Sequence, residues 1–181
     1  MPTLKLSTFN PNHRKEIRQL FFRTFSASEG ESEGRILGTL VDDLITGTAA
    51  EDLYGFVATD NEQIIGCIFF SRMIFTNGLQ AFLLSPVAVD TVFQGKGIGQ
   101  KLINFGINRL REDGISLVVT YGDPVFYSKA GFKSISEQKI KPPYELSQPE
   151  GWLGLSLSGK EISRVVGTLS CVEAFKNSSL W

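Results

Sequence analysis

The stretch VAVDTVFQGKGIGQKLINF, residues 87–105, joins an apolar run to an amphipathic run through three glycines at alternate positions, Gly95, Gly97 and Gly99. The apolar residues before the glycines predict a strand, and the spacing of the aliphatic residues after them predicts a helix. Glycine lets backbone N–H groups approach a ligand closely, and the start of a helix favours a bound phosphate. The stretch therefore predicts a phosphate-binding turn between a strand and a helix.

Length and composition predict one globular domain. The chain has 181 residues, 42% of them hydrophobic and 20% charged, and a chain of this size can bury one sizeable core. We therefore expect a single domain over residues 1–181. The 18 Lys plus Arg residues and 19 Asp plus Glu residues leave a formal net charge of −1, which argues against nucleic acid as a partner.

Two further patterns bear on location and metal binding. The N-terminal sequence lacks the pattern of a signal peptide, and no apolar run has the length of a membrane span, so we expect a cytoplasmic protein without a membrane partner. Cys67 and Cys171 lie far apart and have no metal-ligand spacing around them. Buried, reduced thiols are the simplest expectation, with no metal bound.

Hydrophobic periodicity predicts a mixture of strands and helices. Two amphipathic helices follow a first strand and flank residues 26–34, which we expect to be an exposed loop or a loosely wound helix start. The Asn77-Gly78 pair predicts a hairpin turn. Near the C-terminus the signals are weak, and we expect a terminal strand and a frayed end over the last twenty residues. The expected strands are residues 3–9, 54–59, 64–75, 80–89, 115–122, 132–138 and 152–158, with a helix from 98 to about 114 and a short one ending at Lys129.

Three interpretations of the glycine turn compete with one another. A Walker-type loop needs Gly-Lys followed by Ser or Thr, but here Lys96 is followed by Gly97. The dinucleotide fingerprint G-x-G-x-x-G fails in both frames, because its third glycine position falls on Gln100 or Leu102. The alternative to any phosphate-binding interpretation is a tight strand-to-helix turn without a ligand.

The pattern Gln94-x-x-Gly97-x-Gly99 resembles the Q/R-x-x-G-x-G/A motif of the GNAT superfamily of acyl-CoA-dependent N-acetyltransferases. The preceding strand ends in LSPVAV (84–89), and FYSKAGF (126–132) is similar to a second signature of that family. The local stretch GDPVFYSKAGFK (122–133) resembles a subgroup of predicted bacterial N-acetyltransferases with the pattern GDPxYYxxxGF. The resemblance covers about residues 3–138 by element order.

The resemblance implies an α/β fold of the GNAT type, with a mixed, mostly antiparallel, splayed sheet of about seven strands and about four helices. It also implies acetyl-CoA as co-substrate, an amine of a small molecule or peptide as acceptor, and a possible homodimer. Backbone amides at the glycine turn would hold the diphosphate, and the strand before it would pair with the pantetheine arm. The cofactor-binding residues that we expect are Val87, Ala88, Val89, Gln94, Gly95, Lys96, Gly97, Ile98, Gly99, Asp123, Phe126 and Lys129.

The expected reaction is direct attack of the amine on the thioester. It requires donors for the developing oxyanion, expected from backbone N–H groups near residues 84–87, and an acid for the departing thiolate. Tyr127 is the expected acid, since the family often places a tyrosine hydroxyl near the sulfur. The strand QAFLLSPVAV (80–89) contains no carboxylate, so the candidate bases are Glu31 and Glu33, with solvated surface carboxylates as the alternative. Asp123 is the other candidate base, but a helix N-cap role accounts for it. Many members of the resembled family have a cofactor-binding asparagine in this region, where this chain has Gly122-Asp123.

Two other functions stay open beside the acetyltransferase. One is a module of the same fold that binds an acyl-CoA without turnover, which the lack of a strand carboxylate favours. The other is an acyltransferase that uses a longer acyl group or an alcohol acceptor.

Overall fold

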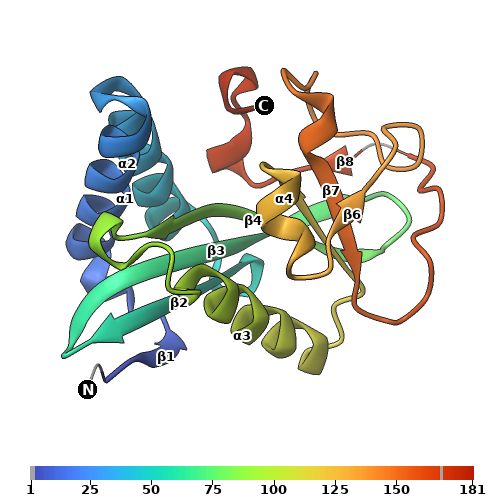
Figure 1. Cartoon of the computed structure of the whole chain (residues 1–181). Helices are drawn as coiled ribbons and strands as arrows, with labels where there is room; N and C mark the ends of the chain where they lie inside the picture. Colours follow the sequence, from blue (N-terminus) through green and yellow to red (C-terminus); the bar gives the residue numbers. More distant parts are fainter. Residues whose placement is uncertain (1–2, 168) are drawn as a thin grey trace. The chain divides into compact units, whose positions relative to one another are not determined.

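The computed structural model describes residues 3–167 and 169–181 (Figure 1). Its strands are β1 Lys5–Thr8, β2 Leu53–Asp60, β3 Gln63–Phe75, β4 Gln80–Val89, β5 Leu117–Tyr121, β6 Lys133–Ser134, β7 Trp152–Ser156 and β8 Leu169–Ser170. Its α-helices are α1 Arg14–Glu29, α2 Glu31–Gly47, α3 Ile98–Glu112 and α4 Pro124–Ser128. Short 3-10 turns connect several of these elements.

The strands form one open, mixed sheet in the hydrogen-bonded order β1-β2-β3-β4-β5-β7-β6, with β8 paired to β3. The pair β4 and β5 is parallel, whereas β1 with β2, β5 with β7, β6 with β7 and β3 with β8 are antiparallel. The pairing of β4 with β5 ends at Leu84 and Thr120, while β4 itself continues to Val89. This architecture confirms the expected fold class.

The described residues form two compact units. Unit 1 comprises the chain up to Phe69 together with Pro86–Gly106, and unit 2 comprises Phe70–Ser85 together with Ile107–Trp181. The elements β3, β4 and α3 each contribute residues to both units. The expectation of a single domain stays a prediction, and each unit is described below by itself.

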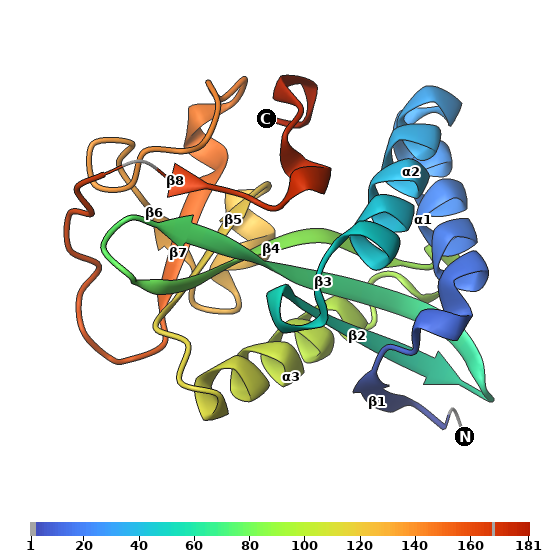
Figure 2. The same ribbon diagram turned by 180° about the vertical axis from the view of Figure 1, so that it is seen from behind.

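In unit 1, β1 lies at the edge of the sheet and pairs with β2 from Lys5 opposite Thr59 to Thr8 opposite Phe56 (Figure 2). The helices α1 and α2 pack against each other through their apolar faces, which bury residues such as Phe21 and Leu37. Gly34 permits this close approach, because a Cβ there would overlap the Ser26 hydroxyl oxygen and the carbonyl oxygen of α1.

The structure corrects the interpretation of residues 26–34 as a loop or loosely wound helix start. Both sides of this segment are regular helix, and the helices meet at Gly30 alone. Gly30 has a φ of 100°, which an L side chain rarely adopts. The Ser, Glu and Gly composition suggested a loop, but it is the composition of two helix ends around one glycine break.

In unit 2, the parallel pair of β4 and β5 is extended by β7 and β6 (Figure 2), and α4 follows β5. The strand expected over residues 132–138 is wrong in length, because β6 has only two residues. Ile135 still donates its backbone N–H to the Trp152 carbonyl at 3.0 Å. Beyond that contact the chain turns away into the Pro-rich connector, where no strand forms.

The last residues of unit 2 are packed, so the expected frayed end is wrong, although β8 supplies the expected terminal strand. The Trp181 side chain is 5% exposed, and its ring lies about 6.2 Å from the rings of Tyr121, Trp152 and Phe175. Its indole N–H donates to the Phe175 carbonyl at 3.0 Å. Aromatic burial therefore fixes a segment whose sequence carries little periodic signal.

The two cysteines match their expected state. Cys67 and Cys171 are both buried and free. Burial raises the pKa of both thiols, which keeps them protonated.

Candidate active site

The glycine turn in unit 1 leads directly from β4 into α3. After β4, Asp90 starts a 3-10 turn by accepting a hydrogen bond from the Val92 N–H at 3.1 Å. Gly95 and Gly97 then adopt φ angles of 78° and 79°. The left-handed conformation explains both glycines, because it disfavours residues with a Cβ.

The space in front of the turn is open. A Cβ built on Gly95 or Gly97 would have no heavy atom within 4 Å. The first helical hydrogen bond of α3 runs from the Lys101 N–H to the Gly97 carbonyl at 3.1 Å. The N–H groups in the first turn of a helix have no carbonyl partner within the helix, and they carry the positive end of the helix dipole. This turn can therefore accept an anion.

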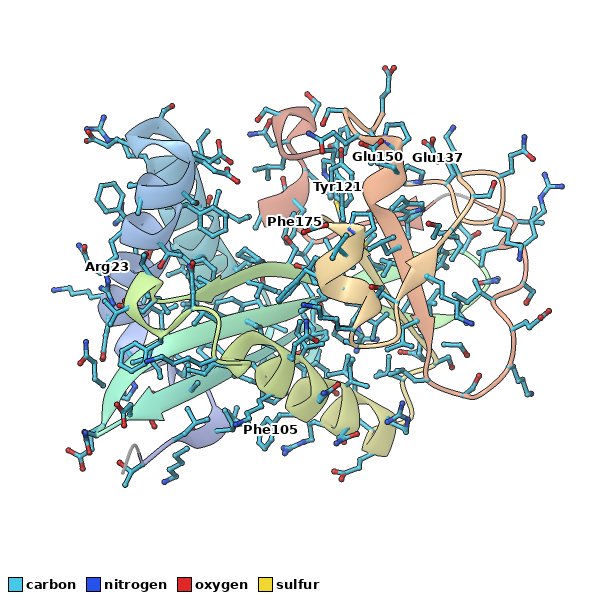
Figure 3. The ribbon with its side chains drawn as sticks, viewed as in Figure 1. Arg23, Phe105, Tyr121, Glu137, Glu150 and Phe175 are labelled. Atoms are coloured by element: carbon cyan, nitrogen blue, oxygen red, sulfur yellow. The ribbon has the colours of Figure 1, made fainter. Side chains whose placement is uncertain are left out.

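Hydrogen bonds from side chains inside and outside the motif hold the turn in place. Arg23 on α1 binds one carboxylate oxygen of Asp90 through Nη2 at 2.8 Å and through Nε at 3.2 Å (Figure 3). The Asp90 N–H donates to the Ile65 carbonyl at 2.8 Å. The Gln94 side-chain amide donates to the Val89 carbonyl at 2.8 Å. Gln94 is the first residue of the motif, and its side chain thus stabilises the conformation of the turn.

The sequence interpretation missed Arg23 and Asp90. Asp90 follows a strand and precedes a turn, so its role as a cap was within reach of the sequence. Arg23 lies 67 positions away from Asp90, and no local pattern links the two residues.

The other expected contacts of unit 1 lie along the same stretch. Val87 and Val89 are half-buried and alternate with the buried Ala88. Ile98 and Gly99 are buried at the start of α3. Lys96 is exposed, and its ammonium lies 5.3 Å from the centre of the Phe93 ring. Such a cation–π contact restrains the ammonium beside the turn.

The candidate bases Glu31 and Glu33 lie in the first turn of α2, in unit 1. The Glu31 carboxylate binds the Arg35 guanidinium at 2.5 Å, and both side chains are mostly exposed. Glu33 is half-buried. The Arg35 pair gives Glu31 a partner that a free general base would not have, and the catalytic role of both glutamates stays a prediction.

Tyr127 lies in unit 2 on α4. Asp123 caps this helix by accepting a hydrogen bond from the Val125 N–H at 2.9 Å, and Pro124 occupies its first position. The ring of Phe126 meets the Tyr127 ring edge to face at 5.0 Å. Lys129 closes the helix and is exposed.

The Tyr127 ring is held on several sides. Phe132 packs edge to face against it at 5.8 Å. A Cβ on Gly122 would lie 2.7 Å from Cε2 of Tyr127, so only glycine fits there without displacing the ring. Gly122 in turn donates its N–H to the Gly151 carbonyl at 3.0 Å. The sequence showed Gly122 only as part of a signature, and the structure gives the steric reason for it.

The surroundings of the Tyr127 hydroxyl keep it protonated. The pKa of Tyr127 is raised to about 12. Burial is the largest cause of this rise, a hydrogen bond with the Thr120 side chain opposes it, and the negative charge of Asp123 adds to it. Tyr127 as a residue is half-buried, but its hydroxyl group has buried surroundings, and these determine the pKa of the side chain. At neutral pH the phenol can therefore act only as a proton donor.

Unit 2 also contains a small cavity of about 40 Å³. Figure 3 labels two of its lining residues, Tyr121 and Phe175, which come from β5 and from the packed C-terminal segment. The Tyr121 hydroxyl is used elsewhere, because it lies 3.0 Å from the Ser147 hydroxyl and accepts from the Gln148 N–H at 2.7 Å. The cavity thus presents mainly aromatic and aliphatic surface, lined by Leu83, Ser85, Tyr121, Phe175, Leu180 and Trp181.

In residues 3–167 and 169–181, no group of three or more His, Cys, Asp or Glu side chains is arranged to hold a metal ion. No helix within those same ranges has both the length and the apolar character needed to cross a membrane.

Part of the chain is similar to a known family of acetyltransferases. Residues 51–134 match the family model described as the acetyltransferase (GNAT) domain. This range contains the glycine turn and the FYSKAGF segment. Over this segment the chain is similar to GNAT acetyltransferases.

Individual GNAT relatives are similar over different lengths. The uncharacterized N-acetyltransferase YhbS of Escherichia coli (strain K12) is 38% identical over 89 residues, which are 48% of this chain and 53% of YhbS. The chain thus matches about half the length of this curated relative. The crystal structure of E. coli YhbS in complex with CoA gives a TM-score of 0.79 at 27% identity and covers 98% of this chain and 94% of that one. A GNAT acetyltransferase of Brucella melitensis in complex with acetyl-CoA gives 0.74 at 27% identity and covers 96% of this chain and 98% of that one.

Proposed function

We propose that this chain is a GNAT N-acetyltransferase that transfers the acetyl group of acetyl-CoA to a primary amine of a small molecule or peptide. The observation that carries the proposal is the braced glycine turn, whose open front and helix N-terminus suit a diphosphate. CoA carries such a diphosphate. The complexes of the neighbours with CoA and acetyl-CoA support the same ligand.

The proposed reaction divides the work between the turn and Tyr127. The amides from Gln94 to Gly99 bind the diphosphate, and the backbone of Val87 and Val89 pairs with the pantetheine arm. The amine attacks the thioester carbonyl, and a backbone N–H near residues 84–87 stabilises the oxyanion. When the intermediate collapses, the C–S bond breaks and the Tyr127 hydroxyl gives its proton to the sulfur.

The amine proton needs a base, because most amines are protonated at neutral pH. We propose Glu31 and Glu33 as the candidate bases, with water carrying the amine proton to either carboxylate. The remaining expected ligands of the co-substrate are Lys96, Asp123, Phe126 and Lys129. We expect their replacement to weaken CoA binding less than changes in the glycine turn, since backbone amides supply most of the diphosphate contacts.

A module that binds acyl-CoA without turnover remains the second candidate, favoured by the lack of a carboxylate in residues 80–89. An assay of thiol release from acetyl-CoA separates the two functions. The acceptors tested are polyamines, aminoglycosides and lysine peptides, and mass spectrometry identifies the acetylated amine. Turnover that falls at least about tenfold in Tyr127→Phe supports the enzyme and its acid. Binding of CoA by calorimetry without turnover of any amine would support the module instead.

The choice of acyl group and acceptor is tested in the same assay. Butyryl-CoA and octanoyl-CoA replace acetyl-CoA, and amino alcohols show whether the product is an amide or an ester. We also propose a cytoplasmic location in a bacterium and a homodimer. Cell fractionation and light scattering of the purified chain test these two proposals.

A further inference from the structure

Thr120 occupies a buried position between β4 and Tyr127. It is the fourth residue of β5, its side chain is fully buried, and it lies opposite Leu84 in the parallel pair of β4 and β5. Its hydroxyl donates to the Leu84 carbonyl at 2.7 Å. A threonine hydroxyl has a single hydrogen. In its hydrogen bond with Tyr127, therefore, the Thr120 oxygen accepts and the Tyr127 hydroxyl donates.

We propose that Thr120 is a positioning residue, which holds the Tyr127 hydroxyl in the resting protein and turns its own hydrogen onto the Tyr127 oxygen when that oxygen gives up its proton. The inference rests on the proposed role of Tyr127 as the acid. In this step the Tyr127 O–H bond breaks and an S–H bond forms. Thr120 keeps its hydrogen throughout. Its hydroxyl stops donating to the Leu84 carbonyl and donates to the Tyr127 phenolate instead.

The packing around Tyr127 explains why such a donor is needed. Gly122, Phe126 and Phe132 pack around the ring, so the phenolate would form on a ring held in buried surroundings. A buried anion without a hydrogen-bond donor is strongly disfavoured. An ordinary phenol is already a weaker acid than a thiol, and burial weakens the Tyr127 phenol further. The transfer to sulfur therefore depends on a group that stabilises the phenolate.

The exchange requires little motion. Two hydroxyl rotations suffice. The Tyr127 O–H turns from the Thr120 oxygen toward the sulfur that takes its proton, and the Thr120 O–H turns from the Leu84 carbonyl to the Tyr127 oxygen, with which it already shares a hydrogen bond. The Leu84 carbonyl loses a side-chain donor but remains within the β4 and β5 pair. The strand backbone can stay in place throughout.

Three variants test the inference. Thr120→Val removes the hydroxyl with little change in shape, and Thr120→Ser restores a donor. Ser71→Ala is the matched control, because Ser71 is also fully buried in unit 2 and its hydroxyl has no hydrogen-bond partner among the described residues. Melting curves establish that each variant folds.

Two measurements are made on the full chain. The first is the kcat and the KM for acetyl-CoA, with the amine that the panel shows to be turned over fastest. The second is the titration of Tyr127 by ¹⁹F NMR, in protein whose four tyrosines are replaced by 3-fluorotyrosine to bring the titration into an accessible pH range. Tyr127→Phe assigns the signal.

We expect Thr120→Val to lower kcat at least about tenfold, equivalent to about 1.4 kcal/mol, with the KM for acetyl-CoA changed less than about twofold. The Tyr127 titration should move up by about one pH unit, which matches the same loss. Thr120→Ser should recover most of both effects, and Ser71→Ala should leave both unchanged.

The results distinguish two failures. If Tyr127→Phe keeps full kcat, the proposed acid is wrong, whatever Thr120 does. If Tyr127→Phe loses activity but Thr120→Val keeps its kcat and its titration, the role of Thr120 is wrong and the acid stands. A loss in Thr120→Val that Thr120→Ser does not repair would also overturn the inference, because it would indicate a packing effect.

Discussion

Replacing Gly97 by alanine should separate the conformational role of the glycine turn from its role in binding. Gly97 has a φ of 79°, and a Cβ there would meet no heavy atom of the protein within 4 Å. The left-handed conformation costs an alanine about 1–2 kcal/mol, which lowers the melting temperature by about 2–8 °C in a chain of this length. The methyl group would also project into the space proposed for the diphosphate. Loss of one charge-assisted hydrogen bond costs about 1.5–3 kcal/mol, a rise in Kd of about 10- to 100-fold.

Gly114 supplies the matched control. Its φ is 80°, and a Cβ there would also meet nothing within 4 Å, but it lies after the end of α3. Both variants should therefore lose similar stability in a thermal melt. Titration calorimetry with CoA should then show a raised Kd for Gly97→Ala alone. If the two variants bind CoA equally well, the turn does not hold the diphosphate and the proposed function loses its main support.

Four other outcomes follow from the structure. Tyr127 has a pKa of about 12 in the folded chain and of about 10 in the unfolded chain. Its contribution to stability is therefore intact below about pH 10 and is lost as the pH rises toward 12. Denaturant unfolding should show that the free energy of unfolding falls more steeply over this range in the wild type than in Tyr127→Phe. Gly122→Ala should displace the Tyr127 ring and lower kcat for thiol release, with CoA affinity unchanged. Asp90→Ala removes a cap worth about 1 kcal/mol and should raise the Kd for CoA about threefold or more; an unchanged Kd would mean that bracing is dispensable. Trp181→Ala should lower the free energy of unfolding by about 3–5 kcal/mol, measured in urea. Val166→Ala, at a position 76% exposed, should change it by no more than about 0.5 kcal/mol.

The parts of the fold that the sequence predicted correctly are those governed by neighbouring residues. The Asn77-Gly78 pair predicted a turn, and Gly78 has a φ of 76° with its N–H bonded to the Phe75 carbonyl at 3.2 Å. The turn before α3 was likewise predicted from spacing within a few positions. Asp123 was recognised as a helix cap, and it caps α4 at 2.9 Å. In each case one short segment contains both the cause and its effect.

The parts that were missed or wrong depend on residues far apart in the chain. Trp181 is buried because rings from several distant segments surround it, and its own neighbours in sequence give no periodic signal. The brace between Arg23 and Asp90 joins a helix to a turn 67 residues later. The long strand expected over 132–138 failed because the partner strand β7 pairs with only two of those residues. Such contacts depend on tertiary packing, which local propensity does not encode.

Glycine acts in opposite ways at the turn in unit 1 and beside Tyr127 in unit 2. At Gly95 and Gly97 the missing side chain leaves space empty in front of the turn, so that a ligand can occupy it. At Gly122 the missing side chain leaves space that the protein itself fills with the Tyr127 ring. A motif can reveal the first kind, because the positive φ and the spacing are local. The second kind depends on which ring the fold brings to that point, so it requires coordinates. At the turn, glycine thus leaves room for a ligand. Beside Tyr127, it lets the ring pack in one fixed orientation, which directed proton transfer from a buried hydroxyl requires.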